Sequence, residues 1–256
     1  MKRIGVVEMV IATAIWGSIP ILAIFSALPS PVFVFFRVFI TSLFLLPFVN
    51  KARFNRFVII SGVFLALNWI FLFYAVSLIQ VSEAVLLYYT GPIFAIITSH
   101  FLGERINRRK AISLLLSLLG IVLITNIDLD FNLGVAMALI SGVFYGFLAV
   151  TSKLSSVNAK ELVFYQSVIA SVITFPFLFL LKFTLTLQSV VIVIISALVN
   201  TLLALFLWYD AISKIGVQLT SILSYLDPVF AMVFAYIFLS QVPSLTSIIG
   251  GVLIIV

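Results

Sequence analysis

Among the ionisable residues inside otherwise apolar stretches of the sequence, where a charge is costly, the leading candidates are Glu8, Arg37 and Asp227. Asp227 directly precedes Pro228, and a proline frees a backbone carbonyl one turn earlier and bends a helix. A carboxylate beside such a bend could bind a proton, a cation or a substrate amine. Arg37 could hold a substrate carboxylate or form a structural ion pair with Asp227, and the sequence leaves both interpretations open. Glu8 could pair with nearby basic residues or join Asp227 in proton coupling.

Neutral polar and aromatic side chains in the same stretches are further candidates for lining a binding cavity. Buried amides, hydroxyls and indole nitrogens require hydrogen-bond partners, either from neighbouring helices or from a substrate. We predict that Asp227 and Arg37 bind substrate together with seven neutral residues: Trp16, Asn68, Tyr89, Tyr145, Gln166, Asn200 and Tyr225. Four prolines would bend the helices and serve as hinges: Pro20, Pro92, Pro176 and Pro228.

Several kinds of site are disfavoured by what the sequence lacks. The chain has no cysteine and a single histidine, His100, so disulfides, thiol catalysis and cysteine or multi-histidine metal sites are excluded. It has no Walker-type nucleotide loop, no HExxH and no GxSxG motif. Glu83, next to Ser82 at the start of an apolar stretch, is better explained by helix capping than by binding. We therefore expect no enzyme activity, no metal and no cofactor.

The apolar stretches that must position these residues are long and numerous. Of the 256 residues, 64% are apolar and 9% are charged, whereas soluble domains have roughly half and about a quarter. A helix that spans a bilayer needs about 20 mostly apolar residues. We therefore predict an all-α membrane protein with ten transmembrane helices, near residues 4–27, 31–49, 57–79, 81–102, 111–127, 133–151, 162–181, 189–209, 216–239 and 244–256, the last being short.

The basic residues favour one orientation in the membrane. If the N-terminus is inside the cell, twelve of the fourteen Lys and Arg residues fall in the inside connections, and only Arg37 and Lys182 do not. This bias follows the positive-inside rule and predicts a multi-pass plasma-membrane protein with both termini in the cytoplasm. It also explains the net charge of +6 without nucleic acid, since the cluster from Arg105 to Lys110 can contact anionic lipid.

The two halves of the sequence resemble each other. With a shift of 136 positions, residues 75–95 share nine identities with residues 211–231, and a shift of 129 aligns segments nearer the start of each half. The aligned pairs include Trp16 with Tyr145, Arg37 with Gln166, Pro47 with Pro176, Tyr89 with Tyr225, and Pro92 with Pro228. Each half has five spans, an odd number, so the second half must cross the membrane in the opposite sense. We predict two inverted five-helix repeats, residues 1–127 and 133–256.

The motifs of both halves resemble a known transporter family. Tyr74-Ala75 leads to Gly91-Pro92-Ile93-Phe94-Ala95 and then Phe101-Leu102-Gly103-Glu104-Arg105, and a second copy leads from Tyr209 to Asp227-Pro228-Val229-Phe230-Ala231. In order, spacing and duplication these segments resemble the EamA-like permeases of the drug/metabolite transporter (DMT) superfamily. The resemblance implies a five-plus-five inverted repeat and a central cavity lined by spans one to four and six to nine. The chain departs from the pattern at Ser240-Gln241, where the first half has Gly103-Glu104.

Together these observations predict a secondary transporter that works by alternating access. It would move small metabolites, such as amino acids or related compounds, or toxic solutes, most simply as an exporter. The expected partners are a small-molecule substrate and membrane lipid, and a homodimer stays an open alternative. The competing functions are a non-transporting membrane scaffold or a channel-like subunit, and a membrane-embedded enzyme is the weakest of them.

Overall fold

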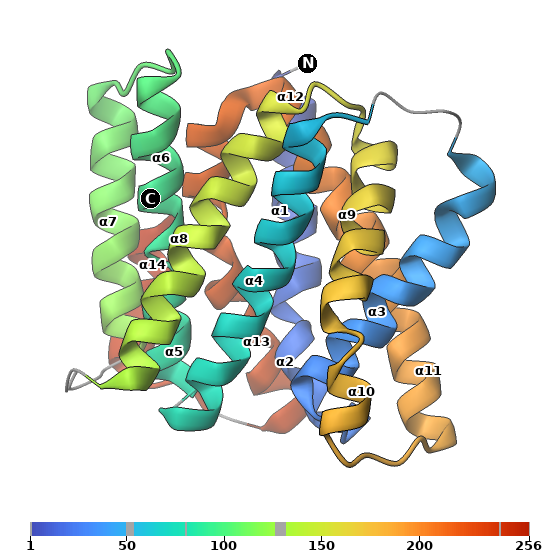
Figure 1. The fold of residues 1–256 in the computed structure, drawn as a ribbon. Helices are drawn as coiled ribbons and strands as arrows, with labels where there is room; N and C mark the ends of the chain where they lie inside the picture. The colour runs from blue at the N-terminus through green and yellow to red at the C-terminus, as the bar shows by residue number, and fades with distance from the viewer. Residues whose placement is uncertain (1, 50–53, 80, 126–131, 241, 256) are drawn as a thin grey trace.

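The computed structural model describes residues 2–49, 54–79, 81–125, 132–240 and 242–255, and all regular structure in these ranges is helical (Figure 1). Up to residue 125 the helices are α1 (Lys2–Gly17), α2 (Ile19–Ser26), α3 (Ser30–Leu45), the 3₁₀ turn η1 (Leu46–Phe48), α4 (Arg56–Leu78), α5 (Val81–Tyr88), α6 (Gly91–Phe101) and α7 (Arg108–Thr125). From residue 132 they are α8 (Leu133–Leu154), α9 (Ala159–Thr174), α10 (Phe177–Leu180), α11 (Leu187–Ile195), the π-helical segment η2 (Ser196–Leu203), α12 (Ala204–Leu223), α13 (Leu226–Leu239) and α14 (Leu245–Ile255).

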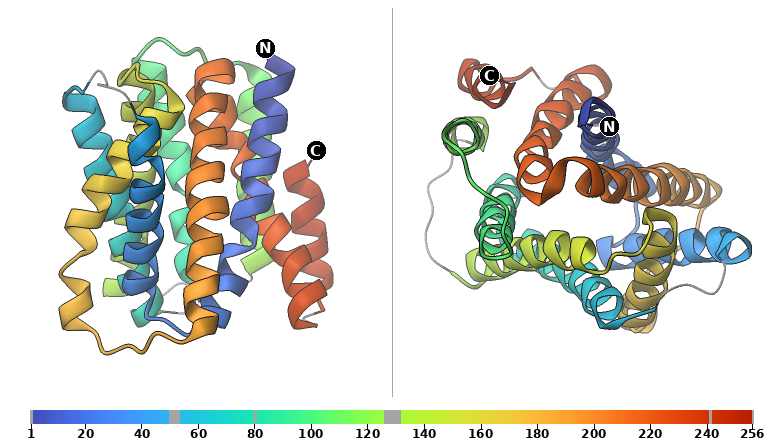
Figure 2. Two further views of the ribbon diagram at one scale, coloured as in Figure 1. Left: turned by 90° about the vertical axis from the view of Figure 1, so that its right-hand side faces the viewer. Right: turned by 90° about the horizontal axis from the view of Figure 1, so that it is seen from above.

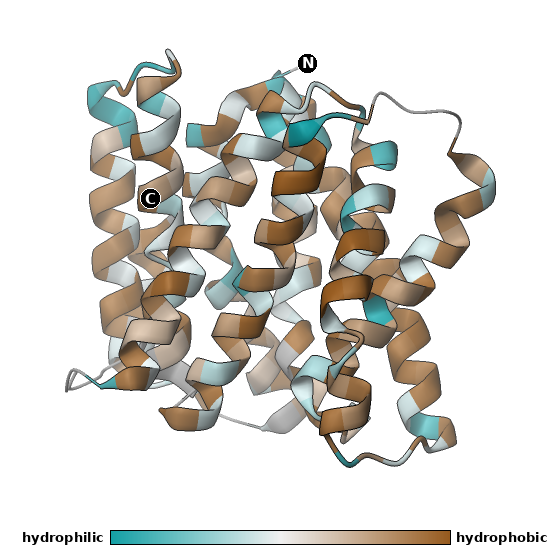
Figure 3. Ribbon diagram, viewed as in Figure 1, coloured by the Kyte–Doolittle hydropathy of each residue, from teal (hydrophilic) through white to brown (hydrophobic). Residues whose placement is uncertain are grey.

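The outer surface of the bundle is apolar along most of its length, and polar residues gather near its two ends (Figure 3). Large side chains such as Phe101 and Leu187 are each 82% exposed, which water would not tolerate over so wide an area. Six helical stretches of the described chain are long and apolar enough to cross a membrane: Lys2–Ser26, Ser30–Phe48, Arg56–Leu78, Leu133–Leu154, Ala159–Leu180 and Leu187–Leu223. The fold is therefore that of a multi-pass membrane protein.

Several of the predicted spans are interrupted, so fewer uninterrupted helices are long enough to span the membrane than the sequence pattern predicts. The span expected at 81–102 breaks between α5 and α6, and the span expected at 216–239 breaks between α12 and α13. Shorter apolar helices remain at Gly91–Phe101, Leu226–Phe238 and Leu245–Ile254. The structure thus bears out an all-helical membrane protein, while the count of ten stays a prediction.

Prolines stand at four of the interruptions. Pro20, Pro92 and Pro228 lie in the first turns of α2, α6 and α13, and Pro176 directly precedes α10. A proline is tolerated in a first helical turn because the backbone N–H that it lacks would have no partner there. Helices therefore begin beside all four prolines, whereas bending and motion about them stay predictions.

Polar residues fix where other helices begin. The side chain of Asn55 accepts hydrogen bonds from the backbone N–H groups of Phe57 and Val58 at the start of α4. Asn158 caps α9 in the same way, and Thr186 and Ser189 cap α11 reciprocally. Such caps satisfy backbone donors that the first turn of a helix leaves free.

The bundle encloses a large shared core, and α7 and α14 lie side by side at its edge (Figure 2). The two edge helices approach closely, since a Cβ atom added at Gly120 of α7 would lie 2.5 Å from the carbonyl oxygen of Gly250 in α14. Side chains of α7 and α14, among them Ile121 and Ile254, pack against Tyr89 and Tyr225. The edge pair therefore covers the two broken spans from outside.

Two glycines allow the broken spans to pack against unbroken helices. A Cβ atom added at Gly146 of α8 would lie 2.6 Å from Phe94 Cβ in α6, and one added at Gly17 of α1 would lie 2.7 Å from Phe230 Cβ in α13. In both places the backbone nitrogen of the residue after the phenylalanine, Ala95 or Ala231, would lie only 2.8 Å from the added Cβ atom. No real Cβ atom fits at such distances, so the helices can approach only because these positions are glycine.

We expect Gly146→Ala to lower the melting temperature of the detergent-purified protein, because over-packing a tight contact costs about 1–3 kcal/mol. Gly251→Ala is the matched control, since its added Cβ would meet the flexible end of Met232 at 3.2 Å. Both substitutions gain the same helix propensity. Heating followed by fluorescence-detected gel filtration measures the difference, and equal melting temperatures for the two variants would contradict the tight packing of α8 on α6.

Candidate functional site

The carboxylate of Asp227 joins the two broken spans. Tyr89 Oη donates a hydrogen bond to Asp227 Oδ2 at 2.6 Å, and Tyr225 Oη donates to the backbone carbonyl of Tyr89 at 2.9 Å. The rings of Tyr89 and Tyr225 lie 6.0 Å apart. Tyr145 Oη and Ser224 Oγ share a further hydrogen bond of 2.6 Å. The breaks between α5 and α6 and between α12 and α13 are therefore held together by tyrosine hydroxyls.

The guanidinium of Arg37 lies on the opposite side of the core and is only 3% exposed. Its Nε donates to Thr201 Oγ1 at 3.0 Å, and its Nη2 reaches the carbonyl oxygen of Asn200 at 3.5 Å. The cation also lies 5.3 Å from the ring centre of Phe33 and 5.4 Å from that of Trp69. All of these contacts are neutral, so none of them offsets the positive charge.

Arg37 and Asp227 do not form the structural ion pair that the sequence left open. In the part of the chain that the structure describes, the salt bridges within 4.0 Å are those of Lys214 with Glu8 and with Asp210. Glu8 thus has a basic partner near the N-terminal end of α1, while its Oε2 is buried without a hydrogen bond to a described residue. Its part in proton coupling stays a prediction.

A row of five aromatic rings runs from the Asp227 side of the core to the Arg37 side. Neighbouring ring centres lie 5.3 Å apart from Tyr89 to Tyr88, 5.3 Å from Tyr88 to Tyr145, 5.7 Å from Tyr145 to Trp208 and 5.7 Å from Trp208 to Trp16. Such separations are those of favourable aromatic pairs. We call these five residues the aromatic row.

The aromatic row ends at η2, where the helix of α11 and α12 widens into π-helical turns. Such turns are rare and often mark functional sites. Asn200 in η2 accepts hydrogen bonds at its backbone carbonyl from Trp16 Nε1 at 3.0 Å and from Arg37 Nη2. The carbonyl of Ala197, one turn earlier, accepts from Thr41 Oγ1 at 2.8 Å. Side chains of α1 and α3 therefore hold the widened turns in place.

Two predicted binding residues make hydrogen bonds that join neighbouring helices beside the aromatic row. Asn68 Nδ2 donates to the carbonyl of Ser141 at 2.9 Å, and Ser141 Oγ donates to the carbonyl of Asn68 at 2.7 Å, which ties α4 to α8. Gln166 accepts from Tyr209 Oη and donates from Nε2 to Ser152 Oγ at 3.1 Å. The structure thus gives Asn68 and Gln166 helix-joining contacts and brings the other seven predicted residues to the ends or the middle of the aromatic row.

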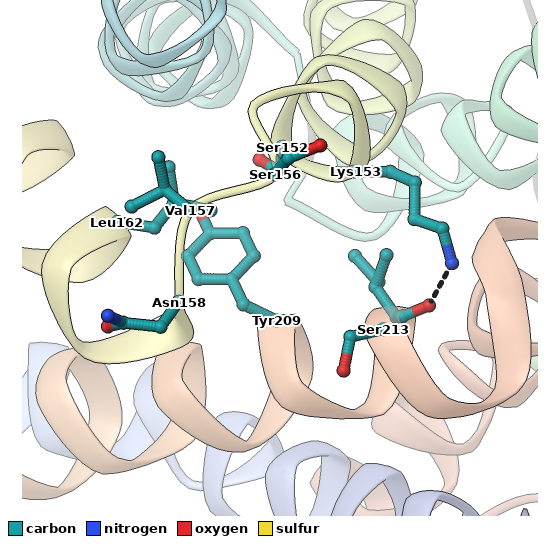
Figure 4. Close-up of a pocket in the computed structure, with 9 residues that line it drawn as sticks. Ser152, Lys153, Ser156, Val157, Asn158, Leu162, Tyr209 and Ser213 are labelled. Carbon is teal, nitrogen blue, oxygen red and sulfur yellow. Dashed lines mark hydrogen bonds between the residues drawn. The ribbon is translucent and has the colours of Figure 1, made fainter. Parts of the chain in front are cut away.

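A pocket of about 390 Å³ opens at the end of the bundle that also holds the N-terminus (Figures 1 and 4). Figure 4 shows the ring of Tyr209 pointing into this pocket, between Ser152 of α8 and Leu162 of α9. Lys153 Nζ donates to the carbonyl of Ile212 across it at 2.9 Å. A neighbouring pocket of about 300 Å³ also contacts Lys153 and extends to Ser99, Glu104 and Val217.

Glu104, which follows α6, caps the helical turn that begins after Gly216. Its two carboxylate oxygens accept the backbone N–H groups of Val217 and Gln218 at 2.9 and 3.1 Å, and Gln218 Nε2 donates back to its carbonyl at 2.9 Å. Lys110 Nζ donates to Gln218 Oε1 at 2.8 Å. Gly216 has a φ of +83°, and a Cβ atom there would meet both carboxylate oxygens at 3.1 Å. We call these contacts the Glu104 clasp.

The binding residues predicted from the sequence do not include Trp208, Tyr88 or Thr201. Trp208 is 1% exposed and lies in the aromatic row between Tyr145 and Trp16. It follows Asn200 by eight residues in one apolar stretch, which was the only available signal. Tyr88 precedes the predicted Tyr89 directly, and Thr201 follows the predicted Asn200.

Comparison with known proteins yields one family and several relatives. The EamA-like transporter family matches residues 3–126 and again residues 132–256. The chain is 27% identical to the uncharacterized transporter YxxF of Bacillus subtilis (strain 168), over 99% of this chain and 88% of that protein. It is 29% identical to the pseudopaline exporter CntI of Pseudomonas aeruginosa (strain UCBPP-PA14), over 90% and 85%. It is 26% identical to the S-adenosylmethionine uptake transporter of Rickettsia bellii (strain RML369-C), over 86% and 79%.

The fold is also found among solved crystal structures, one of which compares as follows. It superimposes with a TM-score of 0.87, covers 98% of this chain and 93% of its own, and is 20% identical in sequence. At that identity the similarity establishes the arrangement of the helices and nothing of the cargo.

We expect Thr41→Val to destabilise the protein by about 0.5–1.5 kcal/mol, because it removes the hydrogen bond from α3 to the carbonyl of Ala197 in η2. Thr151→Val is the matched control, since the Thr151 hydroxyl bonds only to carbonyls of its own helix, those of Phe147 and Leu148. Thermal unfolding in detergent measures both variants. A melting temperature for Thr41→Val as high as that of the control would show that η2 does not depend on α3.

Proposed function

Because the chain belongs to the EamA-like transporter family, we propose that it is a secondary transporter that carries a small metabolite or a toxic solute across the plasma membrane by alternating access. The family and the names of the relatives point to transport rather than catalysis. The relatives include both an exporter and an uptake transporter. We propose export for this chain, with the cytoplasmic side loading the substrate.

The proposed architecture is ten spans in two inverted repeats, residues 1–127 and 133–256, with both termini in the cytoplasm. It is supported by contacts that recur at matched positions of the two halves. Gly17 packs on Phe230, and Gly146 packs on Phe94. The shift of 129 aligns Gly17 with Gly146, and the shift of 136 aligns Phe94 with Phe230. Two repeats that make the same contact can exchange their conformations, which is the basis of alternating access.

The observation that carries the proposal is the pair of broken spans joined at Asp227. Broken helices expose backbone groups and polar side chains at the middle of a membrane, where transporters bind their cargo. The Asp227 carboxylate has Tyr89 as its hydrogen-bond donor, and no cation lies within 4.0 Å of it among the described residues. The carboxylate could therefore take up a proton, or bind a cationic group of the cargo beside Tyr89 or in its place.

The Glu104 clasp would close the cytoplasmic side. It joins the connection after α6 to the turn at Gly216, and the two connections belong to different proposed repeats. The segment that corresponds to Gly103-Glu104 in the second half is the uncharged Ser240-Gln241, of which Gln241 lies outside the described residues. A homodimer remains a prediction.

We expect Asp227→Asn to reduce saturable uptake into liposomes at least tenfold, because an amide cannot take up the proton or counter the charge of a cationic group. The assay offers proteoliposomes a pool of amino acids and other metabolites and measures the content by mass spectrometry. Asp210→Asn is the matched control, since Asp210 pairs with Lys214 near the bundle end. Unchanged uptake by Asp227→Asn would remove Asp227 from the mechanism, and flux that rises without saturation would favour a channel.

We expect Glu104→Gln to open the cytoplasmic side more often. A neutral amide interacts more weakly with a helix N-terminus, and losing a cap costs about 0.5–2 kcal/mol, or up to about thirtyfold in population. The chain has no cysteine, so Ser99→Cys can report access directly. Ser99 is 2% exposed and lines the pocket beside Glu104.

Maleimide labelling of Ser99→Cys should therefore be at least threefold faster with Glu104→Gln than without it. Ser171→Cys is the matched control, because Ser171 is also buried, also bonds within its own helix, and lies toward the opposite end of the bundle. Equal acceleration at both cysteines would indicate general loosening and would contradict a clasp at one end.

A further inference from the structure

The charge of Arg37 has no counter-charge in the structure. No carboxylate of a described residue lies within 4.0 Å of it, and its partners are the Thr201 hydroxyl, the Asn200 carbonyl and two aromatic rings. A buried cation is strongly disfavoured unless an anion accompanies it. A guanidinium has five N–H groups, and the bonds to Thr201 and Asn200 use two of them. Arg37 therefore retains both the charge and the donors to bind an anion.

Two buried polar atoms beside Arg37 also lack protein partners. Asn200 Oδ1 and Trp208 Nε1 have no hydrogen bond to any described residue, although Asn200 is 0% and Trp208 is 1% exposed. Buried groups of this kind are normally satisfied, and an exception calls for a specific explanation. Asn200 Oδ1 is an acceptor and Trp208 Nε1 is a donor, so together they could bind a molecule that offers both kinds of group.

Trp16 contacts both of the residues that carry the unsatisfied atoms, so these residues lie close to each other and to Arg37. Trp16 Nε1 donates to the Asn200 carbonyl, which also accepts from Arg37 Nη2. The Trp16 ring lies 5.7 Å from the Trp208 ring. Trp16 itself is only half-buried and stands one residue before the last residue of α1, directly ahead of the break at Ser18. A movement at that break would carry Trp16 and uncover the three residues.

We propose that Arg37, Asn200 and Trp208 form a binding subsite for a monocarboxylate that also carries a hydrogen-bond donor, as in an amino or hydroxy acid. The carboxylate pairs with the Arg37 guanidinium, the donor of the solute bonds to Asn200 Oδ1, and Trp208 Nε1 donates to a further acceptor of the solute. One guanidinium balances one carboxylate, whereas a phosphate dianion would leave an uncompensated negative charge. This subsite rests on the proposed transport function and narrows its cargo.

The test measures binding to the detergent-purified, full-length chain by thermal shift and titration calorimetry. The probes are L-amino acids and the corresponding 2-hydroxy acids, each beside the amine that lacks its carboxylate. We expect some of the acids to bind and their matched amines to bind at least tenfold more weakly. Equal binding of acids and amines, or no binding of any acid, overturns the subsite.

Variants separate binding from folding. Arg37→Gln should weaken binding of the acid at least tenfold, while Arg56→Gln should not, although Arg56 also lies over a phenyl ring, 5.0 Å from the centre of Phe57. Trp208→Phe removes a donor that bonds to no described residue, so we expect it to weaken binding about three- to tenfold while the protein stays folded. Unchanged affinity in both Arg37→Gln and Trp208→Phe overturns the subsite.

Transport by proteoliposomes distinguishes the subsite from the proposed function. Saturable flux of a solute without a carboxylate, unaffected by Arg37→Gln, would leave the transporter standing and overturn the subsite. Absence of saturable flux for every metabolite, together with specific binding of an acid that Arg37→Gln abolishes, would retain the subsite and overturn transport.

Discussion

A bilayer offers no hydrogen-bond partners to the backbone, and this constraint decides where the rest of the structure is fixed. Each interruption of a helix frees backbone groups that another part of the protein must satisfy. Thr41 supplies a donor to Ala197, Trp16 to Asn200, and Tyr225 to Tyr89. Irregular turns are thus stable only where distant segments meet, so the breaks gather in the core and bring the polar groups of the site with them.

The same bonds that stabilise the breaks also leave them able to change. Hydroxyl and indole donors can exchange one acceptor for another with little rearrangement, whereas a packed aliphatic contact cannot. Tyr89 bonds to a carboxylate and Tyr145 to a serine hydroxyl. One set of polar side chains therefore stabilises the breaks, and a solute bound there, as proposed, would compete for the same donors.

Much of the outline could be predicted from the sequence, because apolar length, prolines and rare charges are local signals. The bends at Pro92 and Pro228 and the prominence of Asp227 follow from such signals. The partners could not be predicted, since helices that are apolar on all sides do not reveal which face turns inward. Asp227 therefore bonds to Tyr89 and not to Arg37. The widened turns of η2 contain no proline and gave no signal, and the signal for Trp208 was only its place in the same apolar stretch as Asn200.

The Glu104 clasp has a consequence for the energetics of a transport cycle. It places a negative charge on a helix start at one end of the molecule, while the corresponding segment of the second half, Ser240-Gln241, carries no charge in the sequence. The two end states of such a carrier would differ in free energy even with no cargo present, and so in how often each is populated. That difference cannot concentrate a solute by itself, because a passive cycle must return to equal concentrations. It would instead make the carrier saturate at different solute concentrations on its two sides. The single carboxylate of Glu104 would then make the rates of transport in the two directions respond differently to concentration.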